Sequence, residues 1–339
     1  MLSIQHVGIS AVAASVPKKY VKNHDLSVAY GESEVNKLIS TIGVEQRHIS
    51  EPTVTSADLC LDAAMNLISQ AKIAAEDIQA VVFVSQTSDY QLPATACILQ
   101  DKLNIPTTAL AFDINMGCSG YVYGLQVAAS LIHSGMKSIL LLVGDTISKL
   151  VKPGDRSTEL LFGDAGTATL VSYMPDSKMS FKLGTDGSGY KNIIAKAPIS
   201  KNSLIGRADN YSYLEMDGGE VFSFTLKVVP RLVNDLLKDL ELTADKIDNC
   251  FYHQANHFML KHLSKKSKFE SKQVPISIDK YGNTSGASIP LTLCATKRES
   301  YRNTLLVGFG VGLSWGAIHC DLTQTMFLPI NELDLDDGK

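Results

Sequence analysis

The chain has 339 residues, of which 45% are hydrophobic and 19% are charged, and its formal net charge is −4. This balance, without a long basic run, argues against nucleic acid as a main partner, and no apolar run approaches the ~20 residues that span a bilayer. Six scattered cysteines, and a start that resembles a strand and not a secretory leader, predict reduced thiols in a soluble, cytoplasmic protein.

Short apolar runs alternate with amphipathic segments of helical length, which predicts an α/β or layered α/β/α fold. The predicted strands are Val7 to Val12, Ala80 to Ser85, Ala109 to Ile114, Ser138 to Val143, Thr167 to Ser172, Asn249 to Tyr252, Thr304 to Val307 and Ala317 to Asp321. The predicted helices are Ser56 to Ala71, Ala94 to Leu103, Cys118 to Ser134, Val221 to Leu240 and Asn256 to Lys265. The Cys118 helix is apolar nearly all round, which is typical of a helix inside the molecule.

The length predicts two domains or one fold of two similar halves. Residues 174–215 are richer in Gly, Ser, Asn and Lys and are interpreted as a connection. We therefore predict a first half over residues 1–175, a connection over 176–215, a second half over 216–329 and a frayed acidic tail over 330–339.

Cys118 stands where an apolar strand turns into an apolar helix, among small residues. A helix N-terminus presents unpaired N–H groups and partial positive charge. Both favour a thiolate, whose pKa can drop from about 8.5 to roughly 3.5–7.5 there. The alternative interpretation is a buried and inert structural cysteine.

Three later segments carry further polar groups. His253 follows a predicted strand and opens a helix, so its ring can point into a cleft. Asn283 lies in a run of small and hydroxylated residues, Tyr281 to Ser288. The glycine-dense turn from Gly308 to Gly316 can bring backbone N–H groups close to a ligand. Taken singly, His253 is more often a core or capping residue, the run around Asn283 is typical of a loop with a helix cap, and tight packing alone also explains the glycine-dense turn.

A zinc site is an alternative use of this histidine. Cys250, His253 and His257 are spaced C-x2-H-x3-H, and His262 follows. Zinc needs four ligands, or three with an open position. No nearby cysteine pair completes the set, and Cys250 points away from His253 if the run is a strand, so we expect no metal.

In joint order and spacing, these segments resemble the β-ketoacyl-acyl-carrier-protein synthase III family of thiolase-like condensing enzymes. The resemblance covers nearly the whole chain and includes Thr41 to Ile49, Asp155 to Thr158, Phe162 to Gly166 and Met216 to Phe222. It implies a five-layered α/β/α/β/α fold of two duplicated halves, usually a homodimer. It also implies a catalytic triad of Cys118, His253 and Asn283, no cofactor, and acyl thioesters of phosphopantetheine as substrates.

The implied reaction is the decarboxylative condensation of an acyl primer with a malonyl-carrier-protein thioester, which gives a 3-oxoacyl thioester in fatty acid or related specialised biosynthesis. Cys118 would hold the primer. The backbone N–H groups of Cys118 and Val311 would form the oxyanion hole, although the family usually has glycine at the second position. His253 Nε2 and the Asn283 amide would stabilise the enolate.

The substrate-binding positions depart from the family pattern. Arg156 matches one side of the usual adenine clamp of coenzyme A, but the usual Trp is Lys37 here. A phosphate-binding Arg is replaced by Thr41, and a pantetheine-contacting Asn by Gly219. Phe222 completes the expected substrate-binding set. These changes predict that the acyl donor is borne by a carrier protein and not by coenzyme A, or that the primer is specialised.

Two further positions concern partners. Lys265 and Lys266 match basic positions that dock an acyl carrier protein, whereas the docking Arg after the histidine is Phe258 here. Leu92 matches a residue that reaches across a dimer to cap the partner's acyl pocket. Leu in place of the usual Phe leaves room for a longer or branched primer.

Several rivals remain open. An acyltransferase of the same fold would move the acyl group from Cys118 to an alcohol or amine, and a non-catalytic member would only bind acyl carriers. A thiolase would need a second catalytic cysteine, for which Cys320 lacks the expected context. A papain-like protease would use Asn283 to orient His253, but the usual flanking sequence is missing.

Overall fold

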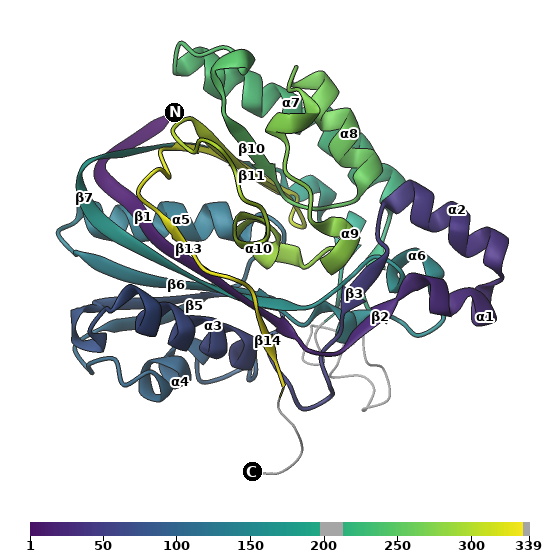
Figure 1. Ribbon diagram of the computed structural model, residues 1–339, viewed down its shortest axis with the longest axis horizontal. Coiled ribbons are helices and arrows are strands. Elements are labelled where there is room, and N and C mark those ends of the chain that lie inside the picture. The colour runs from purple at the N-terminus through teal and green to yellow at the C-terminus, as the bar shows by residue number, and fades with distance from the viewer. Residues whose placement is uncertain (197–212, 335–339) are drawn as a thin grey trace.

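The computed structural model describes residues 1–196 and 213–334, and Figure 1 shows helices packed around a large mixed sheet. The strands of this sheet are β1 (Leu2–Pro17), β4 (Ala80–Val84), β5 (Leu110–Ile114), β6 (Ser138–Asp145), β7 (Ala165–Thr185), β10 (Asn249–Tyr252), β11 (Thr304–Gly310), β12 (Ser314–Cys320), β13 (Met326–Phe327) and β14 (Asn331–Leu333). Two small sheets pair β2 (Tyr20–Lys22) with β3 (Gln46–His48) and β8 (Ile193–Ile194) with β9 (Glu215–Met216).

The α-helices are α1 (Ser27–Tyr30), α2 (Glu32–Ile42), α3 (Ser56–Ala71), α4 (Thr95–Lys102), α5 (Gly120–His133), α6 (Arg156–Glu159), α7 (Gly218–Asp239), α8 (His257–Lys266), α9 (Ile278–Tyr281) and α10 (Ser288–Ala295). All five helices expected from the sequence are present. Two more substantial ones, α2 and α10, were not predicted. Helix α10 has apolar residues on every side and Pro290 in its first turn, so it lacks the amphipathic pattern that marks a surface helix.

The order of the principal sheet is β10-β11-β12-β7-β6-β4-β5, with β1 beside β7. Its core divides into three main clusters that define five layers. Helices α3 and α4 pack on the outer face of β4 and β6, α5 and α10 fill the middle, and α7 and α8 cover the outer face of β10 and β11. The predicted thiolase-like α/β/α/β/α architecture is confirmed, and so is the interior position of the apolar helix after Cys118.

The long strands β1 and β7 serve both halves. Residues 165–172 of β7 pair with β6, whereas residues 180–185 pair with β12. The strand thus continues through residue 175, where we placed the end of the first half, and through ten residues assigned to the connection. Polar residues such as Asp176 and Lys178 hide the strand in the sequence, but Met179 and Phe181 are fully buried. Residues 197–212 of the expected connection lie outside the described residues, and the other boundaries stay predictions.

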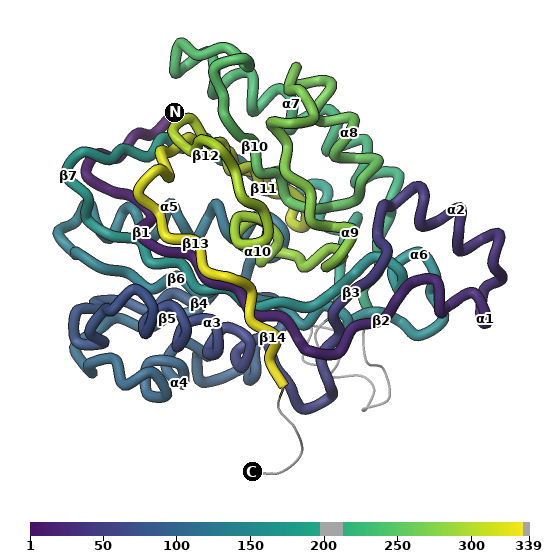
Figure 2. Tube along the Cα trace, in the orientation of Figure 1, coloured from purple at the N-terminus to yellow at the C-terminus, as the bar shows by residue number. Residues whose placement is uncertain are grey.

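The expected frayed tail is partly ordered. Residues Asn331–Leu333 form β14, which pairs in parallel with Ser15–Pro17 of β1, and Figure 2 shows the two segments side by side. The Lys18 N–H donates to the Leu333 carbonyl at 2.9 Å, and the Lys18 ammonium forms an ion pair with Asp334. Backbone pairing therefore holds a segment whose charge alone predicted disorder, while residues 335–339 lie outside the described part.

Within the described ranges, no helix combines the length and the apolar character needed to cross a membrane.

Candidate active site

The nucleophile candidate lies between β5 and α5. Helix α5 begins at Gly120, with Ser119 as its cap. Cys118 therefore precedes the helix, whereas we had predicted that the helix begins at Cys118. The Ser119 hydroxyl makes no capping bond; it lies 2.6 Å from the Ser314 hydroxyl instead. Since Ser314 Oγ also donates to the Val311 carbonyl at 2.6 Å, the glycine-dense turn is tied to the start of α5.

The end of β11 approaches Cys118 very closely. A Cβ atom added to Gly310 would lie 2.6 Å from Cys118 Cβ, and Gly310 has φ +153°. The backbone N–H groups of Val311 and of Cys118 itself both face the Cys118 sulfur. Close packing against Cys118 thus explains the glycine at position 310, and the turn directs the Val311 N–H at the thiol beside the N–H of Cys118 itself.

His253 directly follows β10, and its N–H donates to the Val307 carbonyl of β11 at 2.8 Å. Its ring lies edge-on to Phe309, and Nδ1 is 2.7 Å from Ser288 Oγ. Ser288 Oγ accepts a hydrogen bond from the Gln254 N–H at 3.3 Å, so its own proton can point at Nδ1. The bond at one ring nitrogen selects the tautomer, and donation from Ser288 Oγ to Nδ1 would place the ring proton on Nε2.

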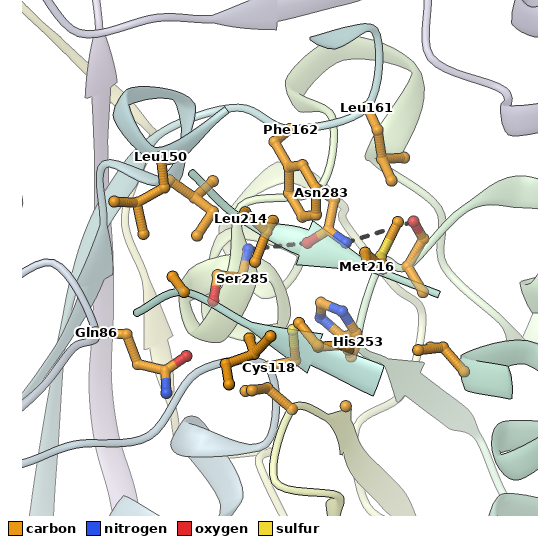
Figure 3. Close-up of a pocket in the computed structure, with 18 of the residues that line it drawn as sticks. Gln86, Cys118, Leu150, Leu161, Phe162, Leu214, Met216, His253, Asn283 and Ser285 are labelled. Carbon is orange, nitrogen blue, oxygen red and sulfur yellow. Dashed lines mark hydrogen bonds between the residues drawn. The ribbon is translucent and has the colours of Figure 1, made fainter. Parts of the chain in front are cut away.

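Asn283 lies in the loop between α9 and the short 3₁₀ helix Ser285–Ala287. Its backbone is fixed beside Phe162, with the Asn283 N–H donating to the Leu161 carbonyl at 2.9 Å. Its Oδ1 accepts the Ser285 N–H at 2.9 Å, and Nδ2 lies 3.5 Å from the Ala255 carbonyl. Because Oδ1 is occupied, the NH₂ group is the free end of the amide, and Figure 3 shows Oδ1 turned toward Ser285, with His253 and Cys118 in the same pocket.

One cavity of about 420 Å³ joins these groups. Cys118, His253, Asn283 and Val311 all line it, although they come from four distant stretches of the chain. Its walls are mostly apolar; they include Leu150, Leu161, Phe162, Leu214, Met216, Val221 and Met259. This size and character are typical of a small-molecule site.

Burial in the pocket shifts the pKa of both Cys118 and His253 toward the neutral form. Burial, and next the charge of Asp145, raise the pKa of the Cys118 thiol to about 11, against the opposing hydrogen bonds from Ser285 and the two backbone N–H groups. Our expectation of a lowered cysteine pKa is therefore wrong, because the desolvation of the thiol outweighs the hydrogen bonds that favour the thiolate. Burial lowers the pKa of His253 to about 3, so its ring is neutral at physiological pH.

The other predicted residues lie elsewhere. Arg156 is an exposed residue of α6 whose guanidinium is 3.6 Å from Glu34. Phe222 stacks on the exposed Phe258, and Gly219 is in the first turn of α7. Leu92, 80% exposed, and the exposed Lys265 and Lys266 at the end of α8 are outside the lining of the pocket described above.

The spacing C-x2-H-x3-H does not form a metal cluster. Cys250 is buried in the core beneath α7 and α8, whereas His253 faces the pocket. Among the described residues, no group of three or more His, Cys, Asp or Glu side chains is placed to hold a metal ion.

Two polar residues of the site were missed by the sequence reasoning. Gln86 follows β4 and lines the pocket, and Ser285 sits beside Asn283 and the thiol. Ser285 belongs to the hydroxyl-rich run that drew attention to Asn283, but only the fold distinguishes it from its neighbours. The signal for Gln86 was only a polar residue at a strand end, which is common.

Comparison with known proteins supplies the family. The N-terminal model of 3-oxoacyl-[acyl-carrier-protein (ACP)] synthase III matches residues 112–187, and its C-terminal model matches residues 237–322. A β-ketoacyl-[acyl-carrier-protein] synthase III of Clostridium tetani is 34% identical over 328 residues, which cover 92% of this chain and 97% of the relative. The chain belongs to the 3-oxoacyl-[acyl-carrier-protein] synthase III family.

Solved structures agree with this placement. A 3-oxoacyl-(acyl-carrier protein) synthase from Burkholderia xenovorans LB400 superposes with a TM-score of 0.92 at 39% identity, covering 98% of both chains. Among sequence relatives, a synthase III from Clostridium perfringens is 36% identical over 309 residues, or 89% of this chain and 94% of that one. The protein is thus an enzyme of the acyltransferase-type condensing class. This placement argues against the alternative interpretations as a thiolase or a papain-like protease.

Proposed function

We propose that this enzyme condenses an acyl primer held on Cys118 with a malonyl-carrier-protein thioester, releasing carbon dioxide and a 3-oxoacyl thioester. The observation that carries the proposal is the convergence of Cys118, His253 and Asn283 in one largely apolar cavity of a synthase III family member. A synthase in fatty acid or a related biosynthesis needs a nucleophile and an enolate stabiliser within reach of each other.

Loading comes first. The Cys118 sulfur attacks the primer thioester, and its acyl carbon stays activated because one thioester replaces another. The tetrahedral oxygen that develops accepts hydrogen bonds from the Cys118 and Val311 N–H groups, which already face the sulfur. Each such donor contributes about 2.7–4 kcal/mol in well-studied oxyanion holes.

Condensation follows. Loss of carbon dioxide from the malonyl group leaves an enolate, whose oxygen accepts hydrogen bonds from His253 Nε2 and Asn283 Nδ2. Both donors are neutral, and both are orientated by partners at the opposite atom, Ser288 for the ring and Ser285 for the amide. The enolate carbon then attacks the acyl group on Cys118.

Release of labelled carbon dioxide from malonyl-carrier protein in the presence of a primer tests the proposal. Release that depends on primer and yields a 3-oxoacyl product supports it. No release with a primer that does acylate Cys118 would favour the acyltransferase that serves an alcohol or amine. No acyl adduct on Cys118 by intact-protein mass spectrometry, for any primer, would favour the non-catalytic carrier-binding protein.

We propose that the acyl donor is carried by a protein and not by coenzyme A. Arg156, one side of the expected adenine clamp, is engaged with Glu34, and the opposite position holds the exposed Lys37. A hollow next to α2 is lined by the carboxylates of Glu45 and Asp279, which would repel the phosphates of coenzyme A. A surface that does not bind the adenine and phosphates of coenzyme A suits an acyl donor that is held by contacts with its carrier protein.

Rates of Cys118 acylation from matched coenzyme A and carrier-protein thioesters test this preference. We expect faster loading from the carrier protein, and Lys37→Trp, which restores a ring opposite Arg156, should raise loading from coenzyme A alone. Faster loading of the unaltered protein from coenzyme A refutes the preference.

The carrier-docking role of Lys265 and Lys266, the homodimer and the cytoplasmic location belong to the same proposal. The dimer is supported by the match of Leu92 to a residue that reaches across a dimer, and by the exposure of both Tyr90 (60%) and Leu92 (80%) in the same loop. Sedimentation of the protein as a monomer at micromolar concentration would remove that support.

A further inference from the structure

Asp145, at the end of β6, is a buried carboxyl group with no part in the steps described above. It is 1% exposed. Its Oδ1 accepts hydrogen bonds from Ser85 Oγ at 3.1 Å, the Gln86 N–H at 2.8 Å and Thr87 Oγ1 at 3.1 Å. Its Oδ2 is buried and makes no hydrogen bond of normal geometry within the described part of the chain. A buried polar atom left in this way calls for an explanation.

The hydroxyl of Ser285 lies near both this carboxyl group and the nucleophile. It is close enough to interact with both the Asp145 carboxyl and the Cys118 sulfur. Ser285 is 3% exposed and has φ +53°, a left-handed conformation that a non-glycine residue seldom adopts. Its N–H bond to Asn283 Oδ1 helps hold this conformation. The strained backbone thus places one hydroxyl near both a thiol and the carboxyl group with the unsatisfied oxygen, and such strain often accompanies function.

Few groups in the pocket could accept the proton that Cys118 must lose. The ionisable groups around Cys118 are His253, Asp145 and, in the pocket wall, Lys196, whose ammonium pairs with Glu215 and has no lone pair to accept a proton. Those that face Asp145 are Cys118 and the core residue Cys60. Burial lowers the pKa of His253 to about 3, which makes its ring a poor acceptor. Burial raises the pKa of Asp145 above its ordinary value, which makes this carboxylate the better one.

We propose that Ser285 and Asp145 form a proton relay for Cys118. As the thiol attacks a thioester, its S–H bond breaks and the proton moves to Ser285 Oγ, while the Ser285 hydroxyl proton moves to Asp145 Oδ2. The carboxylate becomes a neutral acid. When the carrier thiolate leaves, the Ser285 hydroxyl protonates it and Asp145 returns its proton, so that the exchange is neutral overall. Asp145 acts through Ser285 and does not touch the substrate.

The relay predicts a distinctive pH dependence for the nucleophile. A proton shared between Cys118 and Asp145 never enters solvent, so the thiolate fraction below the cysteine pKa should not change with pH. The two groups then titrate as a pair, not as separate residues. An isolated thiol instead loses its thiolate tenfold for each pH unit below its pKa.

Alkylation by iodoacetamide measures this dependence without any acyl substrate. The relay rests on the proposed acylation of Cys118, but this assay can fail or succeed independently of condensation. The full-length protein is treated between about pH 6 and pH 9, and modification is quantified on the Cys118 peptide because the exposed Cys97 would react as well. We expect a rate plateau on the acid side for the unaltered protein.

Two variants should abolish the plateau. Asp145→Asn keeps an acceptor for the Ser85, Gln86 and Thr87 donors but cannot take the proton. Ser285→Ala keeps the N–H bond to Asn283 and removes the connecting hydroxyl. In both, the rate should fall tenfold for each pH unit. If Asp145→Asn shows no cooperative thermal unfolding, Ser285→Ala decides the matter alone.

Asp164→Asn is the matched control. Asp164 is also fully buried, but its carboxylate accepts from Ser50 and Ser148, and it is not among the groups that face the sulfur. The plateau should survive in this variant. A tenfold slope in the unaltered protein, or an unchanged plateau in both Asp145→Asn and Ser285→Ala, overturns the relay.

Discussion

The junctions β5–α5 and β10–α8 each deliver one reactive side chain to the same cavity, and burial acts on them in opposite senses. At the second junction it keeps His253 neutral, which suits a ring that must donate from Nε2. At the first it disfavours the thiolate that Cys118 needs. Desolvation therefore favours the neutral donor form of His253 directly, whereas its effect on the Cys118 thiolate has to be offset by other groups.

The local structures differ accordingly. Helix α8 is capped by its own N-terminal residue, since Asn256 Oδ1 accepts the Met259 N–H at 2.7 Å. The cap residue of α5, Ser119, is used instead to hold the glycine-dense turn in place through Ser314. The cysteine junction thus gives up a helix cap, which elsewhere stabilises by about 1 kcal/mol, and gains backbone donors at the sulfur.

Replacing the nucleophile should abolish the half-reaction at the cysteine junction and leave the half-reaction at the histidine junction. Cys118→Ala is expected to form no acyl adduct, because the attacking atom is gone, yet to retain measurable malonyl decarboxylation, because His253 and Asn283 remain. Intact-protein mass spectrometry and labelled carbon dioxide release measure the two half-reactions. Cys97→Ala, outside the pocket, should behave like the unaltered protein. Equal loss of both half-reactions in Cys118→Ala contradicts the division of roles.

Removing the amide donor should do the reverse. Asn283→Ala is expected to slow decarboxylation about 10²–10³-fold, the effect of losing one preorganised donor, while Cys118 still acylates. Asn283→Asp serves as the matched variant, since it also lacks the NH₂ group but keeps an acceptor for the Ser285 N–H. Normal decarboxylation by the aspartate variant would show that the Asn283 side chain acts by holding the loop through the Ser285 N–H and not by donating a hydrogen bond to the enolate.

Removing the partner of the imidazole should have a smaller effect. Ser288→Ala deletes the hydroxyl beside Nδ1, so the proton is no longer confined to Nε2. A lost hydrogen bond of about 1 kcal/mol corresponds to a roughly five- to tenfold slower decarboxylation. Acylation of Cys118 should be unaffected. Ser277→Ala, whose hydroxyl bonds Thr292 and not His253, is the control; equal slowing in both variants would indicate a packing defect.

The smallest expected effect is an absence of pH dependence. The histidine pKa is lowered to about 3, so the neutral ring persists above that value and protonates only as the pH falls toward it. Decarboxylation by Cys118→Ala should therefore be flat between about pH 5.5 and pH 8. An acid limb centred near 6.5, the ordinary histidine value, would contradict the buried neutral ring.

Much of this site could be predicted from the sequence because its residues stand at strand ends or turns, where a pattern of apolar runs is interrupted. Cys118, His253 and Val311 are of this kind. Ser285 and Asp145 could not be assigned, because their role depends on a left-handed backbone and on a contact between β6 and a loop about 140 residues later in the chain. The extension of β7 was hidden because its middle residues are polar.

By itself, the sequence determined the layered α/β architecture, the buried helix and the set of reactive side chains, since apolar periodicity and residue chemistry are local properties. Only the tertiary structure decided which of these side chains meet, how β1 and β7 join the two halves, and which way the pKa of Cys118 moves. Those depend on burial and on contacts across the chain, and desolvation in an enclosed cavity outweighs what the cysteine's neighbours in sequence would suggest.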